Sequence, residues 1–296
     1  MNQQYCNACP RACGVDRGTK TGFCGVGDAF VIARVGLHLW EEPCISYGSG
    51  SGTVFFSGCN LRCVFCQNHA ISAEGKGKKV SAKTLEEEIL ALQDRGAANI
   101  NLVTPSHMVS RLVPLLQRLR PKLSIPVIYN TSGYDKAESL RALEGLIDIY
   151  LPDFKYASSS MSARYSAAPD YFSVAAAALD EMMRQVGYAE TDKDGHMQKG
   201  VMVRHLVLPG GYRDSIRILN YLAEHYDAEK MAISLMSQYF PAHLAKKDQT
   251  LNRRITTFEY KKVVEAAQEL GFVRGYMQER SSAKEEYVPK FDYGET

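Results

Sequence analysis

Residues 54–68 read Val-Phe-Phe-Ser-Gly-Cys-Asn-Leu-Arg-Cys-Val-Phe-Cys-Gln-Asn. The run begins with apolar β-branched and aromatic residues, which favour a strand, and the run ends at Ser57-Gly58. Three cysteines follow with the spacing C-x3-C-x2-C: Cys59, Cys63 and Cys66. A strand that leads directly into clustered cysteines predicts a metal or cluster site at the carboxyl end of that strand.

Further strand-like runs lie on both sides of amphipathic helical patterns. The predicted strands are Val54–Ser57, Ile100–Thr104, Val127–Asn130, Ile147–Asp153, Val201–Leu208 and Met231–Met236. Their alternation with helices predicts right-handed βαβ units, a parallel sheet and the α/β fold class. Six units are too few for a closed eight-stranded barrel, so a partial (βα)6 barrel and an open doubly wound sheet are the two candidates. In both, the chemistry belongs at the carboxyl ends of the strands.

Cap residues and polar stretches mark the boundaries of these elements. Four helix starts are predicted from possible caps, namely Thr84 with Glu87, Asp170, Asp214 or Ser215, and Thr256 with Glu259. The Ser-rich stretch 157–166 and the polar stretch 190–200 are expected to be surface loops, with a lid or a partner contact as the alternative.

The composition limits the classes of function. The chain has 296 residues, of which 45% are apolar and 23% charged, and its net charge is only +2. We therefore expect no general attraction to nucleic acid or to an anionic membrane. The N-terminus lacks the features of a signal peptide and no apolar run is long enough for a membrane helix, so a cytoplasmic protein is expected.

The predicted division is a Cys-rich extension and linker (1–50), a barrel (51–280) and a tail (281–296).

All eight cysteines lie in the first quarter of the chain. A disulfide framework would be spread through the fold, whereas clustered cysteines in a reducing compartment indicate metal ligands. The first four follow the pattern C-x2-C-x3-C-x10-C: Cys6, Cys9, Cys13 and Cys24. They could hold a structural zinc or an auxiliary 4Fe-4S cluster that relays electrons or contacts substrate, and we favour the cluster. We expect Cys44 to be a small buried hydrophobe and Trp40 to pack between extension and barrel.

The later three cysteines suit a different task. Three thiolates can hold three irons of a cubane and leave the fourth iron open, which is typical of a catalytic site. A zinc knuckle is the alternative, but knuckles usually use C-x2-C pairs and need a fourth ligand. Phe65 offers a flat apolar face beside the cysteines, and Asn68 offers amide donors and an acceptor.

This loop resembles that of the radical S-adenosylmethionine (radical SAM) superfamily. The match is to the pyruvate formate-lyase activating-enzyme branch, in which an aromatic residue precedes the third cysteine and an Asn follows it by two. Together with Glu42-Pro43, residues 49–52 and residues 55–59, the chain is similar to a subgroup of activating-enzyme homologues with an extra Cys-rich N-terminus. The resemblance implies a partial barrel whose 4Fe-4S cluster, on Cys59, Cys63 and Cys66, binds SAM at its open iron. Reductive cleavage of SAM then yields a 5′-deoxyadenosyl radical, which takes a hydrogen atom from the substrate.

The resemblance also implies SAM-binding residues at the strand ends. The second strand ends in Thr104 and Ser106, where the family usually has Gly-Gly-Glu-Pro. The third ends in Asn130 and Thr131, and the fourth in Asp153 and Lys155, which resembles the Asp-x-Lys motif of the family. In some relatives these segments help to hold a monovalent cation beside the SAM carboxylate.

Three further residues are candidates without a family motif. Gln238, near the end of the sixth strand, is a plausible SAM or substrate contact. Arg204 and His205 are consecutive in the fifth strand, so at most one of them points into a barrel.

The partners that the resemblance implies are an electron donor of the flavodoxin or ferredoxin type and a glycyl radical enzyme as substrate. Another peptide or a small molecule is the alternative substrate. A non-enzymatic iron–sulfur electron-transfer module is the alternative from a different class.

Overall fold

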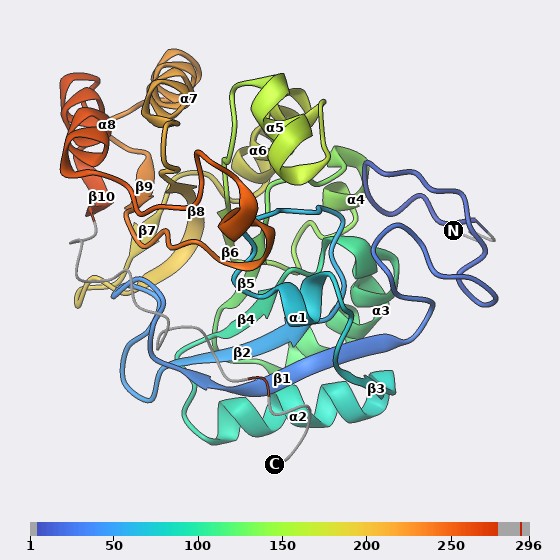
Figure 1. Cartoon of the computed structure of the whole chain (residues 1–296). Coiled ribbons are helices and arrows are strands. Elements are labelled where there is room, and N and C mark those ends of the chain that lie inside the picture. The colour runs from blue at the N-terminus through green and yellow to red at the C-terminus, as the bar shows by residue number, and fades with distance from the viewer. Residues whose placement is uncertain (1–4, 278–290, 292–296) are drawn as a thin grey trace.

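The computed structural model of the chain describes residues 5–277 and Phe291. Its strands form a single sheet in the order β10-β9-β8-β6-β5-β4-β2-β1-β3, with β7 paired to β8 (Figure 1). The strands are β1 (Phe30–His38), β2 (Ser51–Phe56), β3 (Lys78–Val80), β4 (Ile100–Val103), β5 (Val127–Thr131), β6 (Ile149–Pro152), β7 (Glu190–Thr191), β8 (Met197–Leu206), β9 (Ala232–Met236) and β10 (Arg274–Met277).

The helices lie between these strands in the chain. They are α1 (His69–Ser72), α2 (Ala82–Asp94), α3 (Val109–Leu119), α4 (Ala137–Arg141), α5 (Ser159–Ser166), α6 (Tyr171–Val186), α7 (Tyr212–His225) and α8 (Thr257–Glu269). Three short 3-10 helices are η1 (Ser106–Met108), η2 (Arg120–Lys122) and η3 (His243–Lys247). Among the described residues, no helix has both the length and the apolar character that crossing a bilayer requires.

The strand order decides between the two candidate architectures. Strands β2, β4, β5, β6, β8, β9 and β10 are parallel neighbours in sequence order. Every crossover therefore advances in the same direction, and right-handed crossovers then place their helices on one face of the sheet. A doubly wound sheet needs a reversal of direction, which this sheet lacks in its parallel part. The predicted α/β partial barrel is confirmed, and all six predicted strands are present.

Four strands were not predicted. β1 lies within residues 1–50, pairs antiparallel with β2 and carries β3 on its other edge. β10 extends the parallel part beyond β9. The stretch 190–200, expected to be a loop, contains β7 and the start of β8, which pair as a hairpin. The Cys-rich segment is thus connected to the barrel through a strand of the same sheet.

Several local predictions need correction. Helix α2 is capped by the Ser81 side chain rather than by Thr84, because the helix begins three residues earlier than the predicted box. Helix α7 starts after Gly211, and Asp214 lies inside its first turn, where its carboxylate accepts from the Ala157 N–H at 2.9 Å. The Ser-rich stretch forms α5, with Ser158 as its cap.

One aromatic prediction is wrong and one cap is confirmed. Trp40 is 61% exposed, so it is not buried in a seam between extension and barrel; it lies in the segment after β1. Cys44 is buried, as predicted.

At the start of α8, Thr256 and Glu259 form the predicted capping box. Its Glu259 carboxylate also accepts from Arg253 and Gly210, so the box ties α8 to the loop after β8.

Removing this cap should lower the stability of the barrel. Thr256→Ala deletes the hydroxyl that accepts from the Glu259 N–H, and we expect a loss of about 1 kcal/mol in the free energy of unfolding. Urea denaturation monitored by circular dichroism measures this loss. An unchanged midpoint would show that the box does not stabilise the helix.

Candidate active site

The three-cysteine loop leaves the carboxyl end of β2 through a tight turn. Gly58 has a φ of +82°, a conformation that favours glycine, and a Cβ there would lie 2.6 Å from the Cys24 carbonyl oxygen. Beyond the turn, backbone hydrogen bonds from Arg62 to Ser166 and from Val64 to Tyr165 fix the loop against the end of α5. The loop is therefore held in place by the fold itself.

Burial sets the protonation state of the three thiols. It raises the pKa of Cys59 to about 12 and that of Cys63 to about 11, and it also raises the pKa of Cys66. Hydroxyl groups lie within hydrogen-bond distance of two of the sulfurs: Ser166 Oγ is 3.0 Å from Cys63 Sγ, and Ser72 Oγ is 3.1 Å from Cys66 Sγ. A bound metal deprotonates a coordinating thiol outright, so these groups would be thiolates only with a cluster in place.

A cavity of about 280 Å³ opens in front of the cysteines at the carboxyl ends of the strands. Nearly all residues that the sequence singled out line it: Cys59, Cys63, Phe65, Cys66, Asn68, Thr104, Asn130, Thr131, Asp153, Lys155 and Gln238. Ser106 does not line it. Its buried hydroxyl lies 2.9 Å from Thr131 Oγ1, so Ser106 contacts the cavity wall from behind.

Hydrogen bonds hold the ends of β4 and β5 in place beside the cavity. Thr104 has a φ of +60°, which is uncommon for a β-branched residue, and its N–H donates to the Asn130 carbonyl at 2.8 Å. Asp135, which is buried, accepts from the Thr131 hydroxyl and from the Tyr129 hydroxyl at 2.8 Å. Burial raises the pKa of this carboxyl. The network holds both strand ends in a single arrangement.

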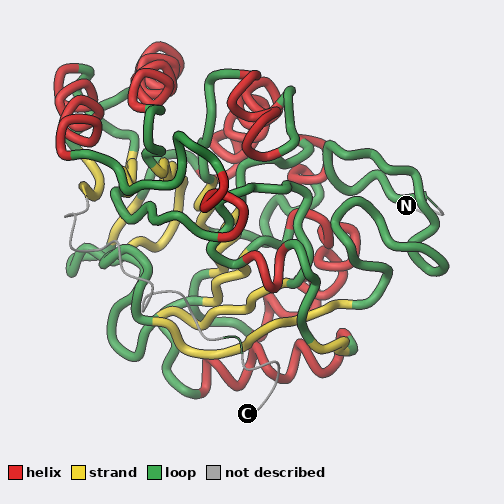
Figure 2. The backbone as a smooth tube through the Cα atoms, in the orientation of Figure 1, coloured by secondary structure: helices red, strands yellow, loops and turns green. Residues whose placement is uncertain are grey.

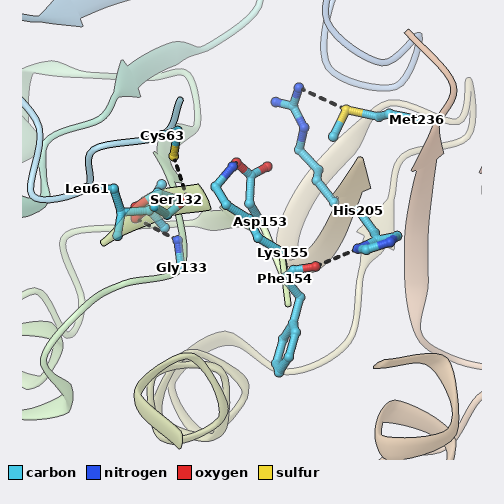
Figure 3. Close-up of polar contacts among 12 residues, drawn as sticks. Leu61, Cys63, Ser132, Gly133, Asp153, Phe154, Lys155, His205 and Met236 are labelled. Atoms are coloured by element: carbon cyan, nitrogen blue, oxygen red, sulfur yellow. Dashed lines mark hydrogen bonds and ion pairs between the residues drawn. The ribbon is translucent and has the colours of Figure 1, made fainter. Parts of the chain in front are cut away.

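Asp153 and Lys155 lie together at the end of β6 (Figure 3). Lys155 Nζ is 2.5 Å from Asp153 Oδ2. Burial alone would lower the pKa of Lys155, but Asp153 and the neighbouring cysteines outweigh it, and the net pKa is raised. The lysine therefore carries a positive charge beside the cysteine loop. It already pairs with Asp153, and the monovalent cation stays a prediction.

Arg204 and His205 point in opposite directions, as predicted. His205 faces away from the cavity, where its ring contacts the Phe154 carbonyl at 2.6 Å (Figure 3) and the Ser215 hydroxyl at 2.8 Å. Arg204 faces inward, with Nη1 3.1 Å from Glu41 and Nε 3.4 Å from Glu42.

Sequence reasoning missed part of the cavity wall. His38 lines it from the end of β1, Trp40 and Glu41 line it from the segment that follows, and Ser132 lines it from the position just after β5. The only sequence signal for this segment was the Glu42-Pro43 pair, whose place in the fold depends on the antiparallel pairing of β1 with β2. That pairing could not be inferred from the periodicity of the strands.

The N-terminal cysteine segment lies against the back of the three-cysteine loop. Residues 5–29 contain neither helix nor strand (Figure 2). Arg11 donates to the Asn60 carbonyl at 2.7 Å, and Arg62 donates to the Phe23 carbonyl and stacks on its ring. The Cys59 N–H donates to the Cys24 carbonyl at 3.3 Å. The segment is thus fixed to the loop by several contacts from both sides.

Comparisons with known proteins identify the family. The model of the radical SAM superfamily matches residues 53–191. The uncharacterized protein MJ0674 of Methanocaldococcus jannaschii is 30% identical over 279 residues, which cover 89% of this chain and 74% of that protein. The chain belongs to the radical SAM superfamily, a class of enzymes that use a 4Fe-4S cluster and SAM.

Solved structures with similar folds have low sequence identity. Methylornithine synthase (PylB) is 13% identical with a TM-score of 0.49, over 71% of this chain and 59% of that chain. Streptococcus suis SuiB, bound to its precursor peptide SuiA, is 11% identical with a TM-score of 0.46, over 71% and 43%. HydG, a maturase of the FeFe-hydrogenase, is 16% identical with a TM-score of 0.48, over 72% and 47%. The chain therefore spans about half the length of these structures.

The residues present fit the two cofactors that the family uses. The three thiols line one wall of the cavity and leave its remaining space open to a ligand of the fourth iron. Ser132 Oγ, which belongs to a residue that lines the same cavity, is buried and has no hydrogen-bond partner among the described residues. A buried hydroxyl of this kind is a natural partner for a polar group of SAM.

Substitution of Cys66 and of Gln238 should have different consequences. Cys66→Ala removes a ligand of the cluster and should abolish SAM cleavage, whereas Gln238→Ala removes one cavity-wall amide and should weaken SAM binding about tenfold at most. Production of 5′-deoxyadenosine and equilibrium binding of SAM measure the two effects. Wild-type cleavage by both variants would contradict this assignment of the site.

Gly133 provides a test of how the strand ends are placed. A Cβ at this residue, which has a φ of +76°, would lie 2.1 Å from the Asp153 carbonyl oxygen and must push β5 away from β6. Gly133→Ala should therefore cost more than about 2 kcal/mol of stability and weaken SAM binding.

Gly145→Ala is the matched control for Gly133→Ala. Gly145 has a φ of +75° but no atom within 4 Å of its added Cβ. It should lose only about 1 kcal/mol, from backbone strain, and keep its affinity for SAM. Equal loss of SAM affinity in both variants would show that strain rather than displacement of Asp153 is responsible.

Proposed function

We propose that this radical SAM enzyme acts on a segment of a partner protein, and that the partner is a glycyl radical enzyme in which the activated radical removes a backbone hydrogen atom of glycine. When bound, the cluster and SAM supply a 5′-deoxyadenosyl radical that abstracts this hydrogen. The resemblance of the loop around Phe65 and Asn68 to that of activating enzymes supports the choice of partner. We place this activity in the cytoplasm, under anaerobic and reducing conditions that preserve the cluster.

The size of the cavity is the observation that carries the proposal. Sites for a single drug-sized ligand usually measure about 300–1,000 Å³, and this cavity of about 280 Å³ is just below that range. SAM is itself a ligand of that size, so little room is left for a second small molecule. A substrate that enters only by a short segment, as a protein loop can, avoids this limit.

The mouth of the cavity suits contact with a polypeptide. Trp40 lines the cavity while its side chain is 61% exposed, and Phe240 lines the same cavity. Exposed tryptophan is enriched at the energetic centres of protein interfaces because it buries a large area and keeps a polar N–H. The rim therefore offers an anchor for a docked protein.

The side chains within the cavity have distinct tasks under this proposal. Lys155 presents an ammonium group to the SAM carboxylate, and Asp153 orients that ammonium and can accept from a ribose hydroxyl. Thr104 and Asn130, on the braced strand ends, bind polar groups of SAM. Phe65, a buried residue of the cavity wall, would exclude water from the space that the cluster and SAM would occupy.

A second substrate class is favoured by one feature of the cavity. Glu41 and Glu42 place two carboxylates against the single guanidinium of Arg204. Burial raises the pKa of Glu41, although Arg204 opposes this effect. A peptide or small molecule with a positively charged group would balance the second carboxylate. The non-enzymatic electron-transfer module, in contrast, has no use for the SAM-sized cavity or for Lys155 within it.

Deuterium transfer distinguishes these substrates. Anaerobically reconstituted enzyme, reduced with dithionite and given SAM, is mixed with a glycyl radical enzyme that was expressed with α-deuterated glycine. We expect deuterium in 5′-deoxyadenosine and a glycyl radical signal in the electron paramagnetic resonance spectrum. Deuterium-free 5′-deoxyadenosine without a glycyl signal would contradict the proposed partner while leaving the radical SAM activity intact.

A further inference from the structure

We propose that the N-terminal four-cysteine segment carries a second 4Fe-4S cluster, and that the basic groove beside it is the docking site for a small acidic electron-donor protein. The segment and groove together would be the electron entrance of the enzyme. The inference rests on the proposed radical SAM function, because that function needs one electron for each SAM cleaved.

The four cysteines are folded into one compact unit. The backbone N–H of Cys6 donates to the Val15 carbonyl at 2.8 Å, and that of Gly14 donates to the Cys6 carbonyl at 3.0 Å, so the chain turns back on itself. A Cβ on Gly22 would lie 3.1 Å from the Cys13 sulfur and 3.5 Å from the Cys24 sulfur, which shows that both sulfurs face the same space. The unit has neither helix nor strand, and a metal centre would supply the cohesion that it lacks.

The spacing of the sulfurs favours a cluster over a single zinc ion. Cys6 and Cys13 contact each other, but among the described residues no three cysteine sulfurs lie within 4.8 Å of one another. One zinc ion with Zn–S bonds of about 2.3 Å would draw all four sulfurs to roughly 3.8 Å apart. A cubane binds each sulfur through a different iron and spreads them more widely. The later cysteine set, which serves the 4Fe-4S cluster of the family, shows the same wide spacing.

The unit is connected directly to the catalytic loop. Cys24, one ligand of the proposed cluster, accepts through its carbonyl from the N–H of Cys59, a ligand of the catalytic cluster. Only a few covalent bonds and this hydrogen bond separate the two sulfurs. No side chain fits between them at Gly58, where a Cβ would meet the Cys24 carbonyl. Such close packing suits electron transfer and has no evident use for a structural zinc.

A groove of about 970 Å³ lies on the outer side of the unit. Its charged lining consists of five cationic side chains and one carboxylate, a net charge of +4: Arg17, Lys20, Lys79, Arg111, Arg118 and Asp28. They come from the N-terminal unit, β3 and α3. Since the whole chain has a net charge of only +2, this is a local concentration of positive charge.

Arg17 joins the groove to the cysteines. Its guanidinium lines the groove and lies 3.8 Å from the Cys24 sulfur, while Nη1 donates to the His107 carbonyl at 2.5 Å. A protein docked in the groove is therefore close to Cys24. A positive surface attracts an acidic partner and speeds its association. Nucleic acid would also be attracted, but it has no electron to deliver to a cluster.

The electron balance is simple. The donor protein is oxidised by one electron, the N-terminal cluster takes up that electron and passes it inward, and the same electron cleaves the carbon–sulfur bond of SAM to give methionine and the 5′-deoxyadenosyl radical. No proton is needed in this sequence.

Metal analysis tests the second cluster. Anaerobically purified wild-type protein should hold about eight irons per chain, and the Cys59→Ser/Cys63→Ser/Cys66→Ser variant should keep about four, with the Mössbauer spectrum of a 4Fe-4S cluster. Four irons and one zinc in the wild-type protein would overturn the proposal. Neither result depends on SAM cleavage, so the metal content separates this inference from the proposed function.

Charge reversal tests the docking site. The Lys20→Glu/Lys79→Glu variant should bind flavodoxin at least tenfold more weakly at low salt, and the ratio of its flavodoxin-driven to its dithionite-driven SAM cleavage should fall by a similar factor. The control, Lys193→Glu/Lys199→Glu, makes the same charge change at exposed positions of the β7–β8 hairpin and should bind as the wild type does. Equal weakening of flavodoxin binding in both variants would overturn the docking site. The same conclusion would follow if the Lys20→Glu/Lys79→Glu variant lost binding to a test RNA but still bound flavodoxin as the wild type does.

Discussion

Gly58 is the residue on which the active site depends. Its left-handed turn ends the first parallel strand and presents Cys59 to the cavity, and its lack of a side chain lets the Cys24 carbonyl approach the loop. A larger residue would separate the N-terminal unit from the loop and distort the cysteine positions at once. One backbone conformation therefore determines both the geometry of the three cysteines and the position at which the N-terminal unit packs against their loop.

The rest of the site follows from the direction of the sheet. Because the parallel strands succeed one another in chain order, their carboxyl ends converge on one cavity. Each strand end contributes a different function: thiols from β2, braced backbone from β4 and β5, and the lysine–aspartate pair from β6. The antiparallel strand β1 adds the acidic segment that faces Arg204. Beside the cysteines the positive charge of Lys155 is paired with Asp153, whereas Glu41 and Glu42 are paired with Arg204.

The sequence predicted the parallel core well because each strand is a short β-branched run and each helix has an apolar face. Leu85, Ile89 and Leu92, for example, recur at helical spacing in the sequence and are all buried in α2. Most of the predicted site residues do line the cavity, since motifs at strand ends converge in any parallel barrel. It could not predict what depends on pairing between distant segments. The position of Glu41 and the basic groove both result from how β1 and the N-terminal unit pack against the barrel. Local sequence periodicity carries no information on that packing. Trp40 was misplaced for the same reason.

The central claim is that SAM binds to the open iron of a cluster on Cys59, Cys63 and Cys66. Pulsed electron–nuclear double resonance of the reduced enzyme with SAM labelled in its amino nitrogen and carboxylate oxygen tests the claim directly. The structure predicts hyperfine coupling of both labels to the cluster in the wild-type protein. Absence of coupling, with an unchanged cluster spectrum on addition of SAM, would contradict it.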